Sequence, residues 1–510
     1  MKSLEQPRIL IIDLGSQYTL NIARELRGLG VRSAVLSPKK AGDWLKANQP
    51  LGIILSGSDS SVNDPESPVP PDSILHRRIP ILGICYGMHW LANELNGKVE
   101  SIPELKEFGP VRVRLNTEDP LFAGLDPQQD VWASHGDSVT VCPLGASQIA
   151  RSLGTGGIAG FSNPHDKLWA LQFHPEVIGT PKGDAMLSNF VFGICGCDKD
   201  WQPADIIGQI REEVIKAVAG RRAEIGMSGG VDSTTSGAII GPALGDLLFP
   251  VTLDTGFLRH QELPEIIANV GYAGLKTKVV RCQGRFERAL AGLTDAERKR
   301  KAFKKLYTRI LEEQAGRFGA KLLIQGTLAT DLIESGTTGG DRIKSHHNVG
   351  LKTWLKQIAP FRNLFKHEVR ALAKAVGLPD SVCLRQPSPG PGLMVRVVGT
   401  PAVQDKVKIV SWADWKTTEI LKRRGEMEKI SQLVVALFGV RITGVKGDGR
   451  AYKYPIAVRP IDSVDFMTAR GHRLSPEIED EIISELTKHQ EIGTVGFFYT
   501  PKPPETIEFE

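Results

Sequence analysis

A cysteine and a histidine–glutamate pair in the first part of the chain have the types and setting of a nucleophile with its base. Cys85 stands in the string GICYG, after an apolar run and before a helix-like stretch, which predicts a strained strand-to-helix turn. Gly83 and Gly87 would leave room around it, and the N-terminus of the following helix favours the thiolate form. In the string QFHPE, His174 would act as general base and Glu176 would orient it. The pattern outweighs the common alternative, a small buried cysteine, and predicts thiolate catalysis.

A second string, SGGVDS, follows an apolar lead-in and precedes another helix-like stretch. Its two glycines let backbone N–H groups converge, and the helix that follows adds the positive end of its dipole, so the string predicts a phosphate cradle. It is not a Walker A loop, because it lacks the G-K-[ST] ending. Asp232 is also suited to bind Mg²⁺. The candidate ATP-binding residues are Ser228, Gly229, Gly230, Val231, Asp232, Ser233 and Thr234.

Both strings lie in stretches where short apolar runs alternate with helical patterns, such as RILIIDLG, LGIILSG and LLFPVTLDTG. This alternation predicts parallel sheets with helices on both faces. The pattern of apolar runs changes after Phe108, where shorter strands are expected, and a third pattern begins after the string PSPGPGL. We therefore expect an α/β protein with two doubly wound parallel-sheet domains, at residues 1–200 and 201–393, and a smaller α+β C-terminal domain at residues 394–510.

The composition excludes several classes of protein. The 510 residues are 41% hydrophobic and 24% charged, and the net charge of +5 is too small to indicate a nucleic-acid partner. No run approaches the roughly 18 apolar residues of a membrane helix, and the opening MKSLEQPRILIIDLG has the pattern of a first strand and not of a signal peptide. The six cysteines are scattered, which argues against a disulfide framework and for a reducing, cytoplasmic setting. Cys195 and Cys197 have no second pair at zinc-ligand spacing.

The strings around Cys85 and His174 closely resemble the class I glutamine amidotransferase family, whose fingerprints are G-x-C-x-G and F-H-P-E. The resemblance implies hydrolysis of glutamine to glutamate and ammonia through a thioester on Cys85. It also implies an oxyanion hole formed by the backbone N–H groups of Gly57 and Tyr86. His135, in the string WASHGD, fits the family near the glutaminase cleft, and a structural role in a turn explains it equally well.

One departure lies beside this site, because Ser58 and Asp59 replace the usual glycine-proline after the Ser-Gly of the oxyanion loop. The string SGGVDS, in turn, resembles the PP-loop of the N-type ATP pyrophosphatases. That resemblance implies cleavage of ATP to AMP and pyrophosphate while a carbonyl oxygen is adenylated. A glutaminase joined to an adenylating domain makes chemical sense, since ammonia can then displace AMP from the activated carbon.

Further strings, among them ILIIDLGSQYT, LDTGFLR, IKSHHNVG, LFKHEVR and KPPETIEFE, resemble the family of glutamine-hydrolysing GMP synthetases along nearly the whole chain. The resemblance implies a ligase that aminates xanthosine 5′-monophosphate (XMP) to GMP, with glutamine and Mg-ATP, through an adenylated intermediate. It implies a homodimer formed through the C-terminal domain, with no nucleic-acid or membrane partner. It also implies a mobile lid that contains Lys344. The residues expected to contact XMP are Lys344, Arg385, Lys502, Thr506 and Glu508.

The departures from this family cluster where the lid and the acceptor pocket are expected. Ala329 and Thr330 stand in place of an aromatic residue and a proline, and Ser388 replaces a phenylalanine. An alternative is therefore a paralogue that keeps both half-reactions but aminates another nucleotide or base-like carbonyl. A third hypothesis, a catalytically silent binding or regulatory partner, is disfavoured by the intact Cys85 and Asp232.

Overall fold

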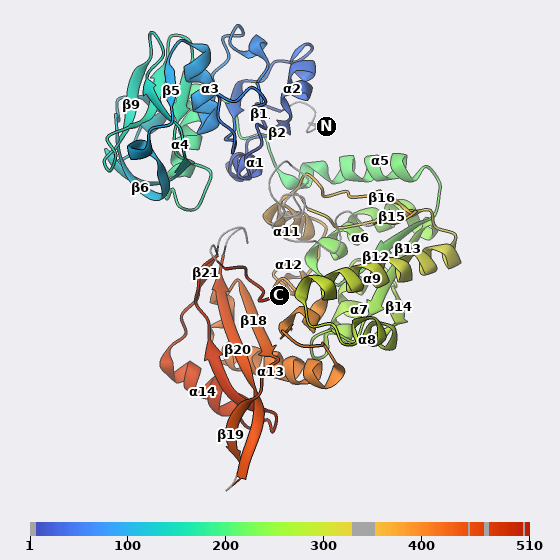
Figure 1. Ribbon diagram of the computed structural model, residues 1–510. Helices are drawn as coiled ribbons and strands as arrows, with labels where there is room; N and C mark the ends of the chain where they lie inside the picture. The colour runs from blue at the N-terminus through green and yellow to red at the C-terminus, as the bar shows by residue number, and fades with distance from the viewer. Residues whose placement is uncertain (1–6, 329–351, 447–448, 464–468, 503–504) are drawn as a thin grey trace. The chain divides into compact units, whose positions relative to one another are not determined.

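The computed structural model describes residues 7–328, 352–446, 449–463, 469–502 and 505–510 (Figure 1). The chain forms two compact units, of which the first ends at Ile206 and the second begins at Ile207. The division into three domains, with boundaries after residues 200 and 393, stays a prediction. Among the described residues, no helix is both long and apolar enough to cross a membrane.

The first unit is built on a nine-stranded sheet in the order β2-β1-β3-β4-β11-β10-β9-β6-β7. Its parallel half consists of β2 (Ser33–Leu36), β1 (Ile9–Ile12), β3 (Gly52–Leu55), β4 (Ile81–Ile84) and β11 (Leu168–Leu171). Four of these five strands are buried at every residue, as expected for parallel strands covered on both faces. The helices of this half are α1 (Thr19–Gly28), α2 (Pro38–Leu45) and α3 (Tyr86–Glu94).

The other half of this sheet is antiparallel, and it corresponds to the section after Phe108 where the sequence turned to shorter strands. It contains β10 (Ile158–Asn163), β9 (Ser147–Ser152), β6 (Glu107–Leu115) and β7 (Gln128–His135). A separate two-stranded sheet pairs β5 (Lys98–Glu100) with β8 (Ser138–Val141), and α4 (Gly183–Ser188) follows β11. Asp200 ties the end of this unit to its first strands, because its carboxylate accepts from Arg8 at 2.9 Å and from Arg32 at 2.8 Å.

The second unit begins with a five-stranded parallel sheet in the order β14-β13-β12-β15-β16, as the sequence predicted. Its strands are β14 (Lys278–Arg281), β13 (Leu248–Asp254), β12 (Ala223–Gly226), β15 (Leu322–Ile324) and β16 (Lys356–Ile358). Its helices are α5 (Ile207–Val218), α6 (Val231–Leu244), α7 (Glu262–Tyr272), α8 (Gln283–Leu290), α9 (Ala296–Phe318), α11 (Lys366–Ala375) and α12 (Asp380–Cys383). Both α6 and α9 pack on β12 and β13.

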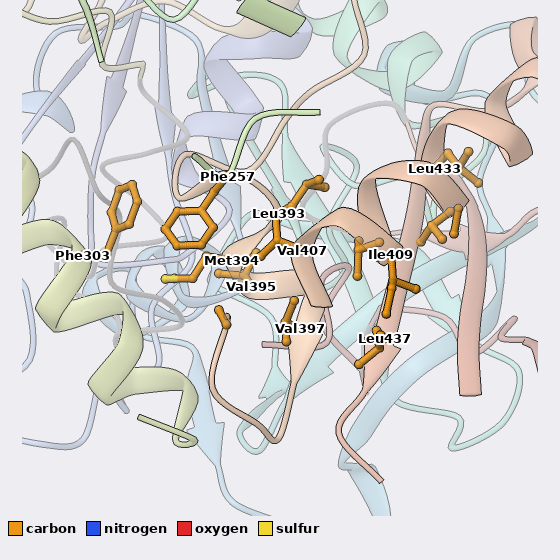
Figure 2. Close-up of a cluster of buried hydrophobic side chains, with 14 of the residues drawn as sticks. Phe257, Phe303, Leu393, Met394, Val395, Val397, Val407, Ile409, Leu433 and Leu437 are labelled. Carbon is orange, nitrogen blue, oxygen red and sulfur yellow. The ribbon is translucent and has the colours of Figure 1, made fainter. Parts of the chain in front are cut away.

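The rest of this unit is an α+β layer, also as predicted. It contains β17 (Val397–Val398), β18 (Gln432–Phe438), β19 (Ile442–Lys446), β20 (Gly449–Asp462), β21 (Arg470–Gly471) and β22 (Ile492–Phe497), with α13 (Gln404–Arg423) and α14 (Pro476–Leu486). One continuous apolar cluster joins it to the parallel-sheet part (Figure 2). Phe303 of α9, Phe257 and Met394 lie at one side of this cluster, and Leu433 of β18 lies at the other side. The parallel-sheet part and the α+β layer of the second unit therefore share one core.

Candidate active sites

Cys85 lies between β4 and α3 in a strained backbone conformation, with φ 52° and ψ −106°. Its backbone N–H donates to the Leu171 carbonyl of β11 at 2.7 Å, which fixes the turn to the sheet. A Cβ on Gly83 would lie 2.6 Å from the Gly87 carbonyl oxygen, and a Cβ on Gly87 would lie 2.7 Å from Leu55. Because neither position has space for a side chain, the nucleophile requires glycine on both sides.

His174 and Glu176 form a buried pair just beyond the end of β11. His174 Nδ1 lies 2.8 Å from Glu176 Oε1, and the two side chains are 3% and 1% exposed. Burial alone would lower the pKa of His174, but the Glu176 carboxylate and the interaction with Cys85 raise it to about 10. The Tyr18 ring packs edge-on against the imidazole, with 5.0 Å between ring centroids. The imidazole is thus held in one orientation and its protonated form is favoured.

The predicted oxyanion residues lie beside this pair. Gly57 follows β3, and a Cβ placed on it would lie 3.2 Å from His174 Cε1. Ser56 holds the loop, because its hydroxyl accepts from the Leu14 N–H at 2.9 Å and donates to the Gly57 carbonyl at 3.0 Å. Tyr86 is the first residue of α3, a position whose backbone N–H has no partner within the helix. The loops after β1, β3, β4 and β11 meet here, at the carboxyl edge of parallel strands where α/β proteins bind ligands.

Sequence reasoning missed three residues of this site, of which two lie beside the sulfur and the third contacts one of those two. The Cys85 thiol lies 3.7 Å from the Ser134 carbonyl oxygen, to which it can donate, and 4.0 Å from Gln172 Nε2. The Gln172 amide oxygen lies 2.8 Å from His89 Nε2. Two of the three have a signal in the sequence. His89 stands one helical turn after Cys85, and Gln172 stands two residues before His174.

His135 occupies a structural position on β7. Its Nδ1 donates to the Asp137 carbonyl at 2.9 Å, and its Nε2 lies 3.4 Å from Glu107 Oε2 on the neighbouring strand. The register pairs Glu107 directly with His135. These contacts join β6 to β7, in keeping with the structural interpretation of this residue.

The SGGVDS string forms a loop between β12 and α6, as expected for a phosphate cradle. Gly229 has φ +69°, and a Cβ there would lie 2.8 Å from the Ile266 backbone. Two donors orient its carbonyl, Asn269 Nδ2 at 3.0 Å and Arg385 Nη1 at 2.7 Å. The hydroxyls of Ser228 and Ser233 lie 3.1 Å apart. These hydrogen bonds from Asn269 and Arg385, which are not part of the loop, hold Gly229 and therefore the loop in place.

Asp232, at the start of α6, has one carboxylate oxygen in an ion pair and one without a partner. Lys366 Nζ of α11 lies 2.6 Å from Asp232 Oδ2, whereas Asp232 Oδ1 is buried and makes no hydrogen bond within the described residues. A buried carboxylate oxygen of this kind is a suitable Mg²⁺ ligand. No group of three or more acidic, cysteine or histidine side chains that could hold a metal occurs in the described part of the chain. Mg²⁺ that arrives with ATP needs only one or two protein carboxylates, so the donor set fits that ion.

A cavity of about 430 Å³ lies beside the loop, within the usual size range of small-molecule sites. The residues that line it come from the loop, from the segment that contains Arg385 and from the C-terminal tail. They include Ser228, Gly230, Asp232, Lys366, Arg385, Ser388, Lys502, Ile507 and Glu508. The structure therefore brings together a phosphate cradle and a charged tail that are far apart in sequence.

The tail residues predicted to contact XMP have well-defined neighbours. Glu508 accepts from Gln432 Nε2 at 2.9 Å and pairs with the fully buried Arg396 at 3.2 Å. Thr506 donates its hydroxyl to the Glu508 carbonyl at 2.6 Å, and the Lys502 backbone pairs with Ala469. Arg385 also forms an ion pair with Glu262 at 2.7 Å. Lys344 lies outside the described residues, as do Ala329 and Thr330.

Residues 10–194 match the glutamine amidotransferase class-I family, and residues 419–509 match the GMP synthase C terminal domain. A relative from Lactobacillus acidophilus is 40% identical over 522 residues, which cover all of both chains. A relative from Aquifex aeolicus is 38% identical over 513 residues, which cover 99% of this chain and all of the relative. A third, from Thermotoga maritima, is 38% identical over 509 residues, which cover 98% of this chain and all of that one. All three are named GMP synthase (glutamine-hydrolyzing).

Proposed function

Because this chain belongs to the family of glutamine-hydrolysing GMP synthases, we propose that it aminates XMP to GMP with ammonia taken from glutamine. The single observation that carries the proposal is the agreement with enzymes of one name over the full length of both chains. ATP is cleaved to AMP and pyrophosphate in the same reaction, so the protein is a carbon–nitrogen ligase. The paralogue with another acceptor receives no support from these relatives.

The glutaminase step begins with attack of the Cys85 thiolate on the side-chain amide carbon of glutamine. The negative charge that develops on the amide oxygen is stabilised by the backbone N–H groups of Gly57 and Tyr86. His174, whose pKa is raised to about 10, donates its proton to the departing ammonia. Water, deprotonated by the same imidazole, then hydrolyses the thioester to glutamate and frees Cys85. Glu176 keeps the imidazole oriented throughout, as its 2.8 Å contact supports.

The synthetase step takes place in the cavity of the second unit. The loop from Ser228 to Thr234 cradles the phosphates of ATP with backbone N–H groups and the Ser228 and Ser233 hydroxyls. Asp232 would hold the Mg²⁺ that accompanies ATP, and this ion would offset the phosphate charge. The base carbonyl oxygen of XMP attacks the α-phosphorus, which releases pyrophosphate and leaves AMP bonded to that oxygen. Ammonia then displaces AMP and gives GMP.

The XMP-binding residues of this proposal are Lys344, Arg385, Lys502, Thr506 and Glu508. The cavity supports three of them, because Arg385, Lys502 and Glu508 line it together with the phosphate cradle. Arg385 has a second role in the proposal, since it holds the Gly229 carbonyl and so shapes the cradle. We also propose a cytoplasmic homodimer formed through the C-terminal domain, without a nucleic-acid or membrane partner.

The test is a product assay with purified protein, ATP, Mg²⁺ and either ammonium or glutamine as nitrogen donor. XMP is offered beside a panel of other nucleotides, and mass spectrometry identifies any product in which oxygen is replaced by NH. We expect GMP and AMP in equal amounts with both nitrogen donors, and no amination of the other nucleotides. ATP cleavage without GMP, or amination of another panel member, would overturn the proposal.

A further inference from the structure

A buried histidine–glutamine pair lies next to the nucleophile and takes no part in the proposed steps of glutamine hydrolysis. His89 of α3 is 4% exposed and Gln172, just after β11, is 3% exposed. The His89 Nε2 to Gln172 Oε1 distance is 2.8 Å, and Gln172 Nε2 lies 4.0 Å from Cys85 Sγ. The three side chains therefore form a row that ends at the reacting sulfur.

The hydrogen on His89 Nε2 and the orientation of the Gln172 amide depend on each other. An amide oxygen only accepts hydrogen bonds, so His89 Nε2 must carry the hydrogen of the 2.8 Å contact. The amide NH₂ group is then turned toward Cys85. The reverse orientation would direct a carbonyl oxygen at the sulfur and would disfavour a negative charge there.

Burial keeps His89 neutral, which suits this role. Burial is the main cause that lowers the pKa of His89, to about 4, and the Gln172 contact opposes it only in part. His135 lowers that pKa further, whereas Asp137 raises it. A neutral imidazole carries one hydrogen, and the Gln172 oxygen holds that hydrogen on Nε2.

The neighbours of the sulfur show why a donor is needed there. The Ser134 carbonyl oxygen, 3.7 Å away, can accept a hydrogen bond from the thiol but disfavours the thiolate, because the negative end of the carbonyl dipole faces the sulfur. His174 is the charged partner of Cys85 and must give its proton to the leaving ammonia. A neutral donor that stays in place would stabilise the sulfur anion before it attacks glutamine and again when hydrolysis of the thioester releases it.

We propose that His89 and Gln172 are positioning residues of the glutaminase site, in which His89 orients the Gln172 amide so that its NH₂ group donates to the Cys85 thiolate. The proposal rests on the proposed function, because it takes Cys85 as the nucleophile and its test follows GMP formation. It assigns a role to a residue of α3, the helix that begins directly after Cys85, and to a residue in the loop after β11 that also carries His174.

The test measures how fast iodoacetamide abolishes glutamine-dependent GMP formation as a function of pH, with ammonia-dependent formation as the reference. Gln172→Met keeps the volume and removes the donor, His89→Leu removes the orienting hydrogen, and His89→Gln restores a donor. Ser162→Ala is the matched control, because Ser162 is 2% exposed, lies in the same unit and bonds Asp119 instead. Circular dichroism confirms that each variant is folded.

We expect Gln172→Met and His89→Leu to move the inactivation midpoint upward by about one pH unit, which makes inactivation about tenfold slower below the midpoint. His89→Gln and Ser162→Ala should stay near wild type. An unchanged midpoint in folded Gln172→Met, or a His89→Gln variant that shifts as far as His89→Leu, would overturn the proposal. Failure of Cys85 as the nucleophile would be seen separately, because wild-type protein would then keep its glutamine-dependent activity after alkylation.

Discussion

Lys366 Nζ lies 2.6 Å from Asp232 Oδ2, although the two residues are 134 positions apart. The lysine comes from α11 and the aspartate begins α6, and both line the cavity beside the phosphate cradle. A cation thus stands where the phosphates of ATP are proposed to bind. The pair balances the charge of the aspartate before the nucleotide and its Mg²⁺ arrive.

Removal of this cation should weaken ATP binding. Lys366→Met is expected to raise the KM for ATP about tenfold in the ammonia-dependent reaction, because a charge-assisted contact to phosphate is lost. Lys374→Met, an exposed change on the same helix, is the control and should leave KM unchanged. Equal KM values in both variants would show that Lys366 does not meet the nucleotide.

Removal of the carboxylate should stop the chemistry of the second unit. Asp232→Asn keeps the shape but loses the negative charge that would hold Mg²⁺, so pyrophosphate release should fall by about 100-fold or more. Pyrophosphate is measured with XMP, ATP and ammonium. Circular dichroism and urea denaturation, compared with wild type, show that the variant is folded. Unchanged pyrophosphate release would contradict the role of Asp232.

The two half-reactions should separate at Cys85. Cys85→Ala is expected to lower glutamine-dependent GMP formation by more than about 1000-fold, because the thioester can no longer form. Ammonium-dependent GMP formation should persist, since ammonia bypasses the first site. Both rates are measured on the same preparation. Loss of both in a folded variant would argue against separate sites.

Gly183 should prove as important for the glutaminase as the glycines that flank Cys85. A Cβ on Gly183 would lie 1.8 Å from the Pro175 carbonyl oxygen, so Gly183→Ala must displace the backbone between His174 and Glu176. A displacement of about 1 Å at a catalytic group typically lowers the rate about 100-fold. We expect that loss in glutamine hydrolysis only. Gly193→Ala, where no atom lies within 4 Å of the added carbon, should behave as wild type.

Glu224 should make the second unit less stable as the pH rises. It is fully buried in β12, neither carboxylate oxygen has a hydrogen-bond partner among the described residues, and burial raises its pKa from 4.5 to about 8. Between these values the folded state binds more protons than the unfolded state. The free energy of unfolding therefore falls with pH, by up to about 1.4 kcal/mol per unit.

Glu224→Gln removes this titration. The free energy of unfolding of the variant should therefore rise relative to that of wild type between about pH 5 and about pH 8, and the difference should stay constant at higher pH. Urea denaturation followed by tryptophan fluorescence measures the difference. Glu212→Gln, an exposed change on α5, should show no such trend. A difference between Glu224→Gln and wild type that is independent of pH would contradict the prediction.

The sequence by itself determined the local parts of both sites. The spacing of Gly83, Cys85 and Gly87 demands a sharp turn after a buried strand, and the Ser-Gly-Gly string demands a loop of converging N–H groups. His174 and Glu176 are only two positions apart in the sequence, so they lie close together whatever the rest of the fold does. The parallel sheets also followed from local alternation of apolar runs with helices.

Only the tertiary structure decided the direction of the later strands in the first sheet, because a buried alternating pattern is the same for parallel and antiparallel pairing. It likewise decided which long-range partners meet. Lys366 reaches Asp232 across 134 positions, Arg385 reaches Gly229 across 156, and Gln172 reaches Cys85 across 87. Contacts at such separations depend on how helices and loops pack on the sheets, and no spacing along the chain encodes that packing.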